Sequence, residues 1–201
     1  MKIAVISEFS ASERNPAIIK ALEGRGHDVY NVGMRGPDDQ PNLSYLHTGL
    51  LAALLLNAGA VDLVVGGCGT GVGFQMAASM YPGVYSAVIQ EPLDAWLFAQ
   101  INAGNCVSLP LNQNFGWAAD VRLRHVFDRF FEVESGAGYP PHRSEPQRAY
   151  REQLAAINAA CHRPMREILK SLDPDLVRQA LKAHCLPELL AGTEYADLLK
   201  K

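Results

Sequence analysis

Short apolar runs alternate with longer amphipathic stretches over the first 130 residues. Five runs are rich in Val, Ile, Leu and Ala and have the length of buried strands, at 3–7, 29–32, 63–67, 84–89 and 106–109. Around them, apolar residues recur at helical spacing, at 15–25, 44–58, 74–80, 94–103 and 117–130. Alternation of strand and helix is typical of a parallel sheet covered by helices on both faces. The pattern therefore predicts an α/β fold with a five-stranded parallel sheet.

A break follows the last of these helical stretches. Residues 135–141 are Ser-Gly-Ala-Gly-Tyr-Pro-Pro, and a helix cannot continue through paired prolines. We therefore place a sheet domain at residues 1–135 and a hinge with a helical extension at 136–201. Further helices are expected at 146–160, 164–171, 174–184 and 194–200. The extension is too small for a core of its own, so it should pack on the sheet domain or on a second copy of the chain, and we expect it to cross to the second copy.

Composition narrows the class of ligand. The chain has 201 residues, of which 48% are hydrophobic and 19% charged, with a formal net charge of −3. It has no cationic stripe of the kind that binds nucleic acid, and no apolar run that reaches the roughly 20 residues of a membrane span. The apolar run at the N-terminus is too short for a signal peptide, so a cytoplasmic location is expected. These features favour a small molecule as the ligand.

Cysteine and histidine spacing gives no indication of a metal site. The chain has four cysteines, Cys68, Cys106, Cys161 and Cys185. None forms a C-x-x-C pair, which argues against a zinc ribbon or a disulfide framework. His47 and His125 lie on helical patterns without a Cys or His at ligand spacing. We therefore expect reduced thiols and no metal.

The most distinctive segment is Gly-Gly-Cys-Gly-Thr-Gly-Val-Gly at 66–73, between the third predicted strand and a helix. A strand that ends in glycines leaves backbone N–H groups free and directs them, with the positive end of the next helix, toward an anion. Cys68 lies at the mouth of this loop, where the same field makes its thiol a better base or nucleophile. Five glycines in eight residues exceed what a turn requires, so we favour a ligand site over a turn with a buried structural thiol.

Two familiar phosphate-binding motifs do not fit this loop. A dinucleotide fingerprint would need a glycine where the chain has Phe74, and it would follow the first strand rather than the third. A P-loop would end in Gly-Lys-Ser or Gly-Lys-Thr, whereas residues 73–75 are Gly-Phe-Gln and supply no lysine. Neither nucleotide-binding motif is therefore present in the loop.

Motifs before and after the loop suggest a family. They are Met-Ala-Ala at 76–78, Pro-Gly-Val at 82–84 and Glu-Pro at 91–92, with Asp-x-Pro at 39–41 and Asn-x-x-Asn at 102–105. This order resembles the ribose-5-phosphate isomerase B and galactose-6-phosphate isomerase family. The resemblance implies a Rossmann-like three-layer α/β/α sandwich. It also implies an aldose–ketose isomerase of a phosphorylated sugar that uses neither metal nor nucleotide cofactor and works as a homodimer or a tetramer.

The resemblance also implies roles for individual residues. The family's loop cysteine moves a proton between C1 and C2 of the open-chain sugar, so Cys68 would be the base. The enediolate oxygen would bind to the loop N–H groups, with the Thr70 hydroxyl as a further donor. Substrate contacts are implied for Glu8, Gly69, Gly71, Val72, Gly73, Asn102, Arg143 and Arg148. The two arginines would hold phosphate, often across the dimer, with Arg151 as an alternative register. Glu8 as a simple helix cap and the arginines as solvated charges stay open as alternatives.

Two family histidines are replaced in this chain. The one after the first-strand carboxylate falls on Phe9, and the one that opens the sugar ring falls on Ile101. An enzyme without that donor should prefer a tetrose 4-phosphate, which cannot close a five-membered ring, over ribose 5-phosphate. Two alternatives remain open: an isomerase of a non-phosphorylated or carboxylated sugar, and a sugar-phosphate-binding or regulatory module without turnover. The retained Cys68 argues against the second, because a pure binder needs the glycines and not the thiol.

Overall fold

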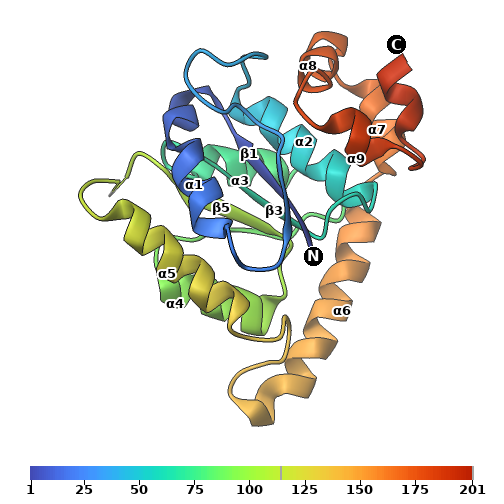
Figure 1. Ribbon diagram of the computed structural model, residues 1–201. Helices are drawn as coiled ribbons and strands as arrows, with labels where there is room; N and C mark the ends of the chain where they lie inside the picture. Colours follow the sequence, from blue (N-terminus) through green and yellow to red (C-terminus); the bar gives the residue numbers. More distant parts are fainter. Residues whose placement is uncertain (114, 201) are drawn as a thin grey trace.

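The computed structural model describes residues 1–113 and 115–200, with a five-stranded sheet at its centre (Figure 1). The strands are β1 (Lys2–Ser7), β2 (Asp28–Asn31), β3 (Leu63–Cys68), β4 (Ser86–Val88) and β5 (Cys106–Pro110). All neighbouring strands pair in parallel, in the order β2-β1-β3-β5-β4. The predicted α/β fold is confirmed, and each predicted strand overlaps an observed one.

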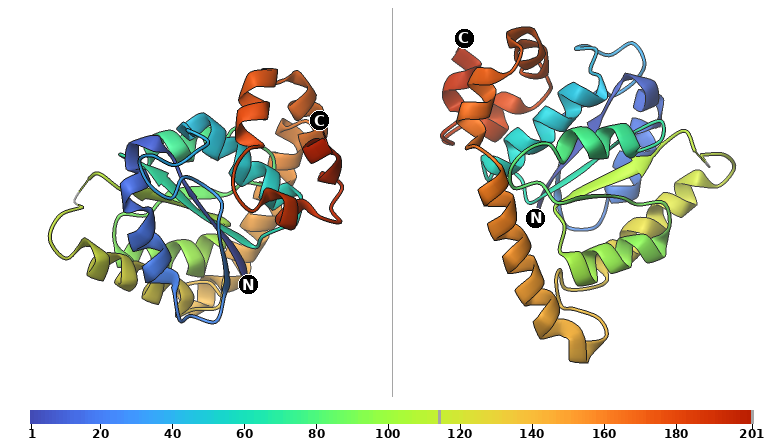
Figure 2. Two further views of the ribbon diagram at one scale, coloured as in Figure 1. Left: turned by 45° about the horizontal axis from the view of Figure 1, so that its top comes forward. Right: turned by 180° about the vertical axis from the view of Figure 1, so that it is seen from behind.

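Helices cover both faces of the sheet (Figure 2). One face carries α2 (Tyr45–Asn57) and α3 (Val72–Ala78), and the other carries α1 (Asn15–Leu22), α4 (Pro92–Leu97) and α5 (Ala119–Phe131). Along β1, Ile3 and Val5 enter the core under α1 and α5, whereas Ala4 and Ile6 enter the core under α2. A strand buried on both sides is apolar throughout, which explains why the strand runs showed no polar alternation.

Some helix bounds differ from the predictions for local reasons. A turn of 3-10 helix that the pattern did not indicate, η1 (Phe9–Arg14), connects β1 to α1. The helix predicted at 94–103 already begins at Pro92, because Glu91 and Asp94 form a capping box and proline suits a first turn that needs no N–H. It then widens into a π-helical turn, η2 (Phe98–Asn102), before β5.

The extension is built of short helices after one long one. They are η3 (Pro141–Arg143), α6 (Ser144–Cys161), α7 (Met165–Ser171), α8 (Pro174–Ala180), α9 (Leu186–Leu190) and η4 (Ala196–Lys200). Of these, η3 and α9 were not predicted. Met165, Ala180 and Leu186 join the core that contains α2, so the part after α6 packs on its own chain. By contrast, α6 runs along one side of the molecule and buries none of its residues (Figures 1 and 2).

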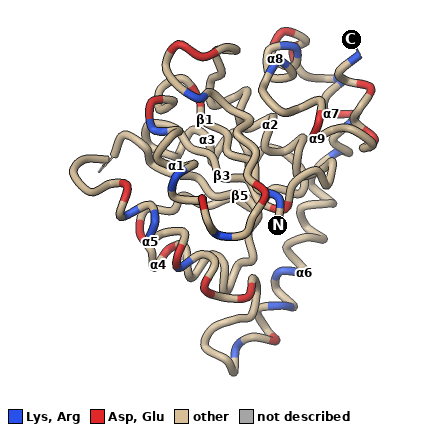
Figure 3. Tube along the Cα trace, in the orientation of Figure 1, with Lys and Arg blue, Asp and Glu red and all other residues tan. Residues whose placement is uncertain are grey.

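Two features of the whole molecule bear on its partners. No helix among the described residues is both long enough and apolar enough to cross a membrane. Lys and Arg are interspersed with Asp and Glu along the described trace (Figure 3), so this trace shows no continuous cationic stripe.

Candidate active site

The strand register brings Glu8 and Cys68 to the same edge of the sheet. Ser7 pairs with Gly67, and Cys68 pairs with Pro110, so the carboxyl ends of β1, β3 and β5 meet. After β1 the chain crosses to α1 on one face, and after β3 it crosses to α3 on the other. Open α/β sheets bind ligands outside the carboxyl ends of their strands, at the point where connections diverge in this way.

Glycine is required at two positions of the loop after β3. Gly71 has a φ of +75°, in the left-handed region that side chains disfavour, and its carbonyl accepts a 2.6 Å hydrogen bond from the Ser108 hydroxyl. A Cβ atom on Gly67 would stand 2.3 Å from the carbonyl oxygen of Leu109. The loop can therefore pack against β5 only with glycine at these positions, which brings its backbone close to Cys68.

The thiol of Cys68 lies in a narrow space at the end of β3. The residue is 7% exposed, and its Sγ is 3.9 Å from Oγ1 of Thr70. A Cβ atom on Gly73 would meet the ring of Tyr45 at 3.4 Å and the Cys68 sulfur at 3.6 Å. The sulfur and the Tyr45 ring therefore flank Gly73, and a side chain at this position would fill the space between them.

The glycine loop that carries this thiol also carries backbone N–H groups, and only some of them have partners. Gly69 donates to the Ser10 hydroxyl at 3.3 Å, Gly71 to the Cys68 carbonyl at 3.3 Å, and Val72 to Oγ1 of Thr70 at 3.3 Å. No other described residue accepts from the N–H groups of Thr70 and Gly73. Unpartnered N–H groups at the first turn of a helix are suited to an anionic oxygen.

Glu8 is connected to the loop through Ser10. Its carboxylate is 1% exposed and accepts a hydrogen bond from the Ser10 hydroxyl, which in turn accepts the N–H of Gly69. Burial raises the pKa of the Glu8 carboxyl above its ordinary value, and the hydrogen bonds of Ser10 offset this only in part. A carboxyl group with a raised pKa is therefore linked to the anion-binding loop through the single side chain of Ser10.

Ser10 and Asn112 complete this network, and neither was among the predicted substrate contacts. The side chain of Asn112 donates to the Ser10 carbonyl at 2.9 Å, and its backbone N–H donates to the Gly69 carbonyl at 2.9 Å. Both residues follow the end of a strand, β1 or β5. That position, at the edge where parallel strands bind ligands, is the feature by which they could have been found.

The four thiols differ sharply in their surroundings. Cys106 is fully buried in β5, and burial raises its pKa to about 12, which keeps it protonated. Cys161 is exposed on α6, and Cys185 is half-buried in the extension. Only Cys68 lies beside the loop N–H groups. Over the described part of the chain, no three His, Cys, Asp or Glu side chains gather closely enough to hold a metal ion.

One chain does not bring the other predicted substrate contacts to this site. Cys106, at the start of β5, pairs with Val64, which lies four residues before Cys68 on β3. Asn102 is exposed and lies a further four residues before Cys106. Four strand residues span about 13 Å, so Asn102 lies beyond the opposite edge of the sheet.

The predicted phosphate-binding arginines lie near that opposite edge. Arg143 and Arg148 are exposed at the start of α6. The guanidinium of Arg151 holds this part of α6 to the turn before β5, because it donates to the Ile101 carbonyl at 2.7 Å. Arg151, the alternative phosphate-binding residue, is thus engaged within its own chain. Arg143 and Arg148 remain the predicted anion-binding pair.

Residues 3–134 match the family model described as Ribose/Galactose Isomerase. The match spans the sheet domain and includes the glycine loop with Cys68. The chain belongs to this family. The family assignment made from the motifs is therefore confirmed, and with it the coarse activity of a sugar isomerase.

Two solved structures resemble the entire chain, extension included. A 4-deoxy-L-threo-5-hexosulose-uronate ketol-isomerase complexed with a tartrate is 38% identical, with a TM-score of 0.94, and the match covers 100% of this chain and 96% of that one. A ribose-5-phosphate isomerase, LacAB_rpiB, from Vibrio parahaemolyticus is 39% identical, with a TM-score of 0.94 and coverage of 100% and 98%. Isomerases in this family thus carry names that refer to a carboxylated sugar as well as a phosphorylated one.

A third relative extends this range of substrates. The 4-deoxy-4-sulfo-D-erythrose isomerase of Clostridium sp. (strain MSTE9) is 26% identical over 109 residues, which make up 54% of this chain and 67% of that enzyme. Its name refers to a sulfonated tetrose. The three names share a sugar with an anionic group and differ in which anion it is.

Proposed function

We propose that this protein is an aldose–ketose isomerase of an open-chain sugar with a terminal anion, and that Cys68 is its base. One observation carries the proposal: a buried thiol lies beside the unpartnered N–H groups of Thr70 and Gly73 at the carboxyl end of the sheet, in a chain of the isomerase family. A thiol can both take and return a proton near neutral pH, and fixed N–H groups stabilise the oxyanion that forms meanwhile.

The proposed reaction uses these groups in order. The Cys68 thiolate removes the proton from C2 of the aldose, the C–H electron pair forms a C1–C2 double bond, and the carbonyl pair moves to O1. The enediolate oxygen is held by the N–H groups of Thr70 and Gly73. The Thr70 hydroxyl passes a proton from O2 to O1, and Cys68 then protonates C1 while O2 becomes the ketose carbonyl. Glu8 binds a hydroxyl of the sugar at the β1 edge.

The choice of an open-chain substrate rests on Ile101 and on the relatives. In 4-deoxy-4-sulfo-erythrose, a sulfonate replaces the C4 hydroxyl that would close a five-membered ring. In 4-deoxy-5-hexosulose uronate, C4 has no hydroxyl and C5 is a ketone. The sugar therefore lacks the C4 and C5 hydroxyls that close five- and six-membered rings. This chain has Ile101 where the family resemblance places a ring-opening histidine, and an apolar side chain cannot protonate a ring oxygen. We infer that the chain acts on sugars that need no ring opening.

The first candidate substrate is the 4-deoxy-5-hexosulose uronate. The ketol-isomerase named for it matches this chain over its full length, including the helical extension. A phosphorylated sugar is the second candidate, favoured by the equally similar enzyme of Vibrio parahaemolyticus. Among phosphorylated sugars, erythrose 4-phosphate is the form that stays open and therefore suits the same site.

We also propose that the active enzyme is a homodimer. Asn102, Arg143 and Arg148 are exposed and lie far from Cys68 in their own chain, so they could hold the substrate anion only in the site of a second copy. Such sharing would complete both sites at once. It would also explain why three polar side chains that are predicted to bind substrate do not lie near Cys68 of their own chain.

Exposed apolar side chains support this assembly. Val72 and Met76 on α3 and Met80 just after it follow one another at helical spacing and are 48%, 60% and 68% exposed. On α6, Leu154 and Ile157 are more than half exposed. Side chains of this size on one face of a helix are typical of surfaces that are covered in an assembly.

Proton exchange in deuterated water tests the proposed reaction directly. The full chain is incubated in turn with the hexosulose uronate, erythrose 4-phosphate and ribose 5-phosphate, and deuterium at C1 of the ketose product is measured by NMR. We expect incorporation with the uronate first, erythrose 4-phosphate second and ribose 5-phosphate last. A clear preference for ribose 5-phosphate would contradict the open-chain substrate, and no exchange with any of the three would leave only a binding module.

A matched variant separates the role of Ile101 from the identity of the anion. If ring opening limits turnover, Ile101→His should raise the rate with ribose 5-phosphate and leave the rate with erythrose 4-phosphate unchanged. An equal effect on both substrates would show that Ile101 acts on something other than ring opening.

A further inference from the structure

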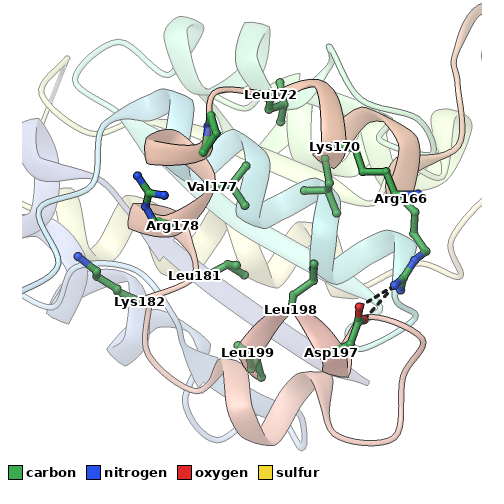
Figure 4. Close-up of a pocket in the computed structure, with 12 residues that line it drawn as sticks. Arg166, Lys170, Leu172, Val177, Arg178, Leu181, Lys182, Asp197, Leu198 and Leu199 are labelled. Atoms are coloured by element: carbon green, nitrogen blue, oxygen red, sulfur yellow. Dashed lines mark hydrogen bonds and ion pairs between the residues drawn. The ribbon is translucent and has the colours of Figure 1, made fainter. Parts of the chain in front are cut away.

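A cavity lies in the extension, away from the glycine loop. Helices α7 and α8 and the final turn η4 enclose a cavity of about 640 Å³ (Figure 4). Its lining residues all lie between positions 166 and 199, whereas the proposed isomerase site is built from residues 8–112 together with Arg143 and Arg148 of a second copy. Cavities of about 300–1,000 Å³ are typical of small-molecule sites. The part of the chain that the family model does not cover thus has a pocket of its own.

The wall of this cavity is apolar. In Figure 4, aliphatic side chains from α8, the turns on either side of it and η4 line the cavity, and α7 contributes one more lining residue. They are Leu169, Leu172, Val177, Leu181, Leu198 and Leu199. Each is half-buried, because it packs on the core under α2 on one side and faces the cavity on the other. A ligand that removes these faces from water must itself have an apolar body.

The rim of the cavity is cationic. Arg178 and Lys182 stand on one side, and Arg166 and Lys170 on the other (Figure 4). The guanidinium of Arg166 is paired with both carboxylate oxygens of Asp197 at 2.9 Å, and Arg178 is paired with an exposed aspartate of its own helix. The two lysines form no salt bridge with any described residue, although Lys182 donates to a glutamine side chain at 3.3 Å.

Charge at this cavity runs against that of the chain. Four cations and one carboxylate line it, and with the aspartate that pairs with Arg178 these groups carry a net charge of +2, while the whole chain carries −3. An apolar wall under a cationic rim complements one kind of molecule. We propose that the cavity binds an amphipathic organic anion, with its apolar chain against the leucines and its carboxylate at Lys170 and Lys182. The ligand class is that of a medium-chain carboxylate.

Calorimetric titration of the full chain with decanoate tests this site. Decanol and decyltrimethylammonium have the same apolar chain with no charge or a positive charge. We expect one decanoate per chain, binding at least about tenfold more tightly than decanol, and no detectable binding of the cation. Equal affinities for decanoate and decanol would overturn the proposal, because the lysine rim would then contribute nothing.

Variants locate the bound anion. Lys170→Gln combined with Lys182→Gln should weaken decanoate binding about tenfold or more and leave decanol binding unchanged. The matched control, Lys20→Gln combined with Arg124→Gln, removes two charges from the sheet domain and should leave both affinities unchanged. Leu198→Asn should weaken both ligands. If it unfolds the extension, as circular dichroism would show, the lysine variants still decide.

Two further results would contradict the proposal, because decanoate would then bind at the isomerase site or a second copy of the chain would fill the cavity. Displacement of decanoate by erythrose 4-phosphate would assign the binding to the isomerase site and overturn the proposal. Sedimentation of the lysine double variant covers the other case: a loss of dimer without any decanoate binding in the native chain would mean that a second copy fills the cavity. Persistence of decanoate binding at saturating erythrose 4-phosphate supports a separate site and does not depend on isomerase turnover.

Discussion

The two ends of the central sheet are built in opposite ways. At the carboxyl end, Glu8, Ser10 and Asn112 join the glycine loop in one hydrogen-bond network around a buried thiol. Toward the amino end, the side chains predicted to bind the substrate anion, Asn102 and the α6 arginines, are exposed. The carboxyl end is preorganised within a single chain. The other end presents exposed polar groups that form no binding site within their own chain.

This difference indicates a division of labour. Proton transfer requires groups fixed within a fraction of an ångström, which a buried network on strand ends supplies. Holding an anion requires charge that can reach it, which an exposed helix can supply to a neighbouring molecule. A site divided in this way would be complete only in an assembly, and each half should fail differently when it is altered.

The largest effect is expected at the carboxyl end. Cys68→Ser should lower turnover by about 10²- to 10⁴-fold, because a serine hydroxyl is far too weak a base, and should leave substrate affinity nearly unchanged. Turnover with the hexosulose uronate and binding by calorimetry measure the two quantities. Cys161→Ser, an exposed thiol on α6, is the matched control and should behave as the native protein. A Cys68 variant that keeps most of its turnover would remove the thiol from the mechanism.

Altering the other end should affect binding instead. Arg148→Ala or Arg143→Ala should raise KM about tenfold for an anionic substrate and leave kcat close to the native value, because each removes a charge that binds ground state and transition state alike. Steady-state kinetics with substrates that have and lack the anion measure this. Arg163→Ala, also exposed in the extension, is the control. Equal effects on charged and uncharged substrates would show that these arginines do not hold the anion.

The assembly itself can be broken without touching either half of the site. Leu154→Glu together with Ile157→Glu places two charges on the exposed apolar face of α6, and we expect the dimer dissociation constant to rise at least tenfold. Sedimentation at micromolar concentration measures it. Leu93→Glu, on an equally exposed residue of α4, should leave the dimer intact. A double variant that remains dimeric would mean that α6 is not at the interface.

The two ends of the sheet also differ in how much of their structure could be predicted from the sequence. Alternating apolar runs predicted the sheet, and parallel strands imply that Glu8 and Cys68 share an edge, so this half of the site could be predicted from local patterns. The contact of Tyr45 with Gly73 and the hydrogen bond of Ser10 to Gly69 could not, because they depend on how separate loops approach one another. The chain pattern left the sheet domain and a second copy as possible surfaces for the extension, and crossing to the second copy was expected, whereas the region after α6 packs on α2 of its own chain. Helical periodicity does not identify the surface that a helix covers.

The smallest expected effect concerns the link between the extension and the carboxyl end of the sheet. Asp39, in the loop after β2, bonds to the His184 ring at 2.9 Å and to the N–H groups of Arg35 at 2.7 Å and Gln40 at 2.8 Å. Burial alone would raise the pKa of Asp39, but these hydrogen bonds outweigh it and lower the pKa below its ordinary value. The folded state therefore favours the ionised carboxylate.

The sign of the pH dependence follows from that lowered pKa. A carboxyl with a depressed folded pKa contributes stability above its unfolded pKa of about 3.9, and this contribution is lost as pH falls through the folded value. Asp39→Asn should thus cost about 1 kcal/mol at pH 7, and urea unfolding should show the difference from the native chain shrinking as the pH falls below about 4. Asp38→Asn, at the adjacent exposed position, should cost nothing at either pH. A deficit for Asp39→Asn that stays as large in acid would show that the carboxylate acts through packing rather than charge.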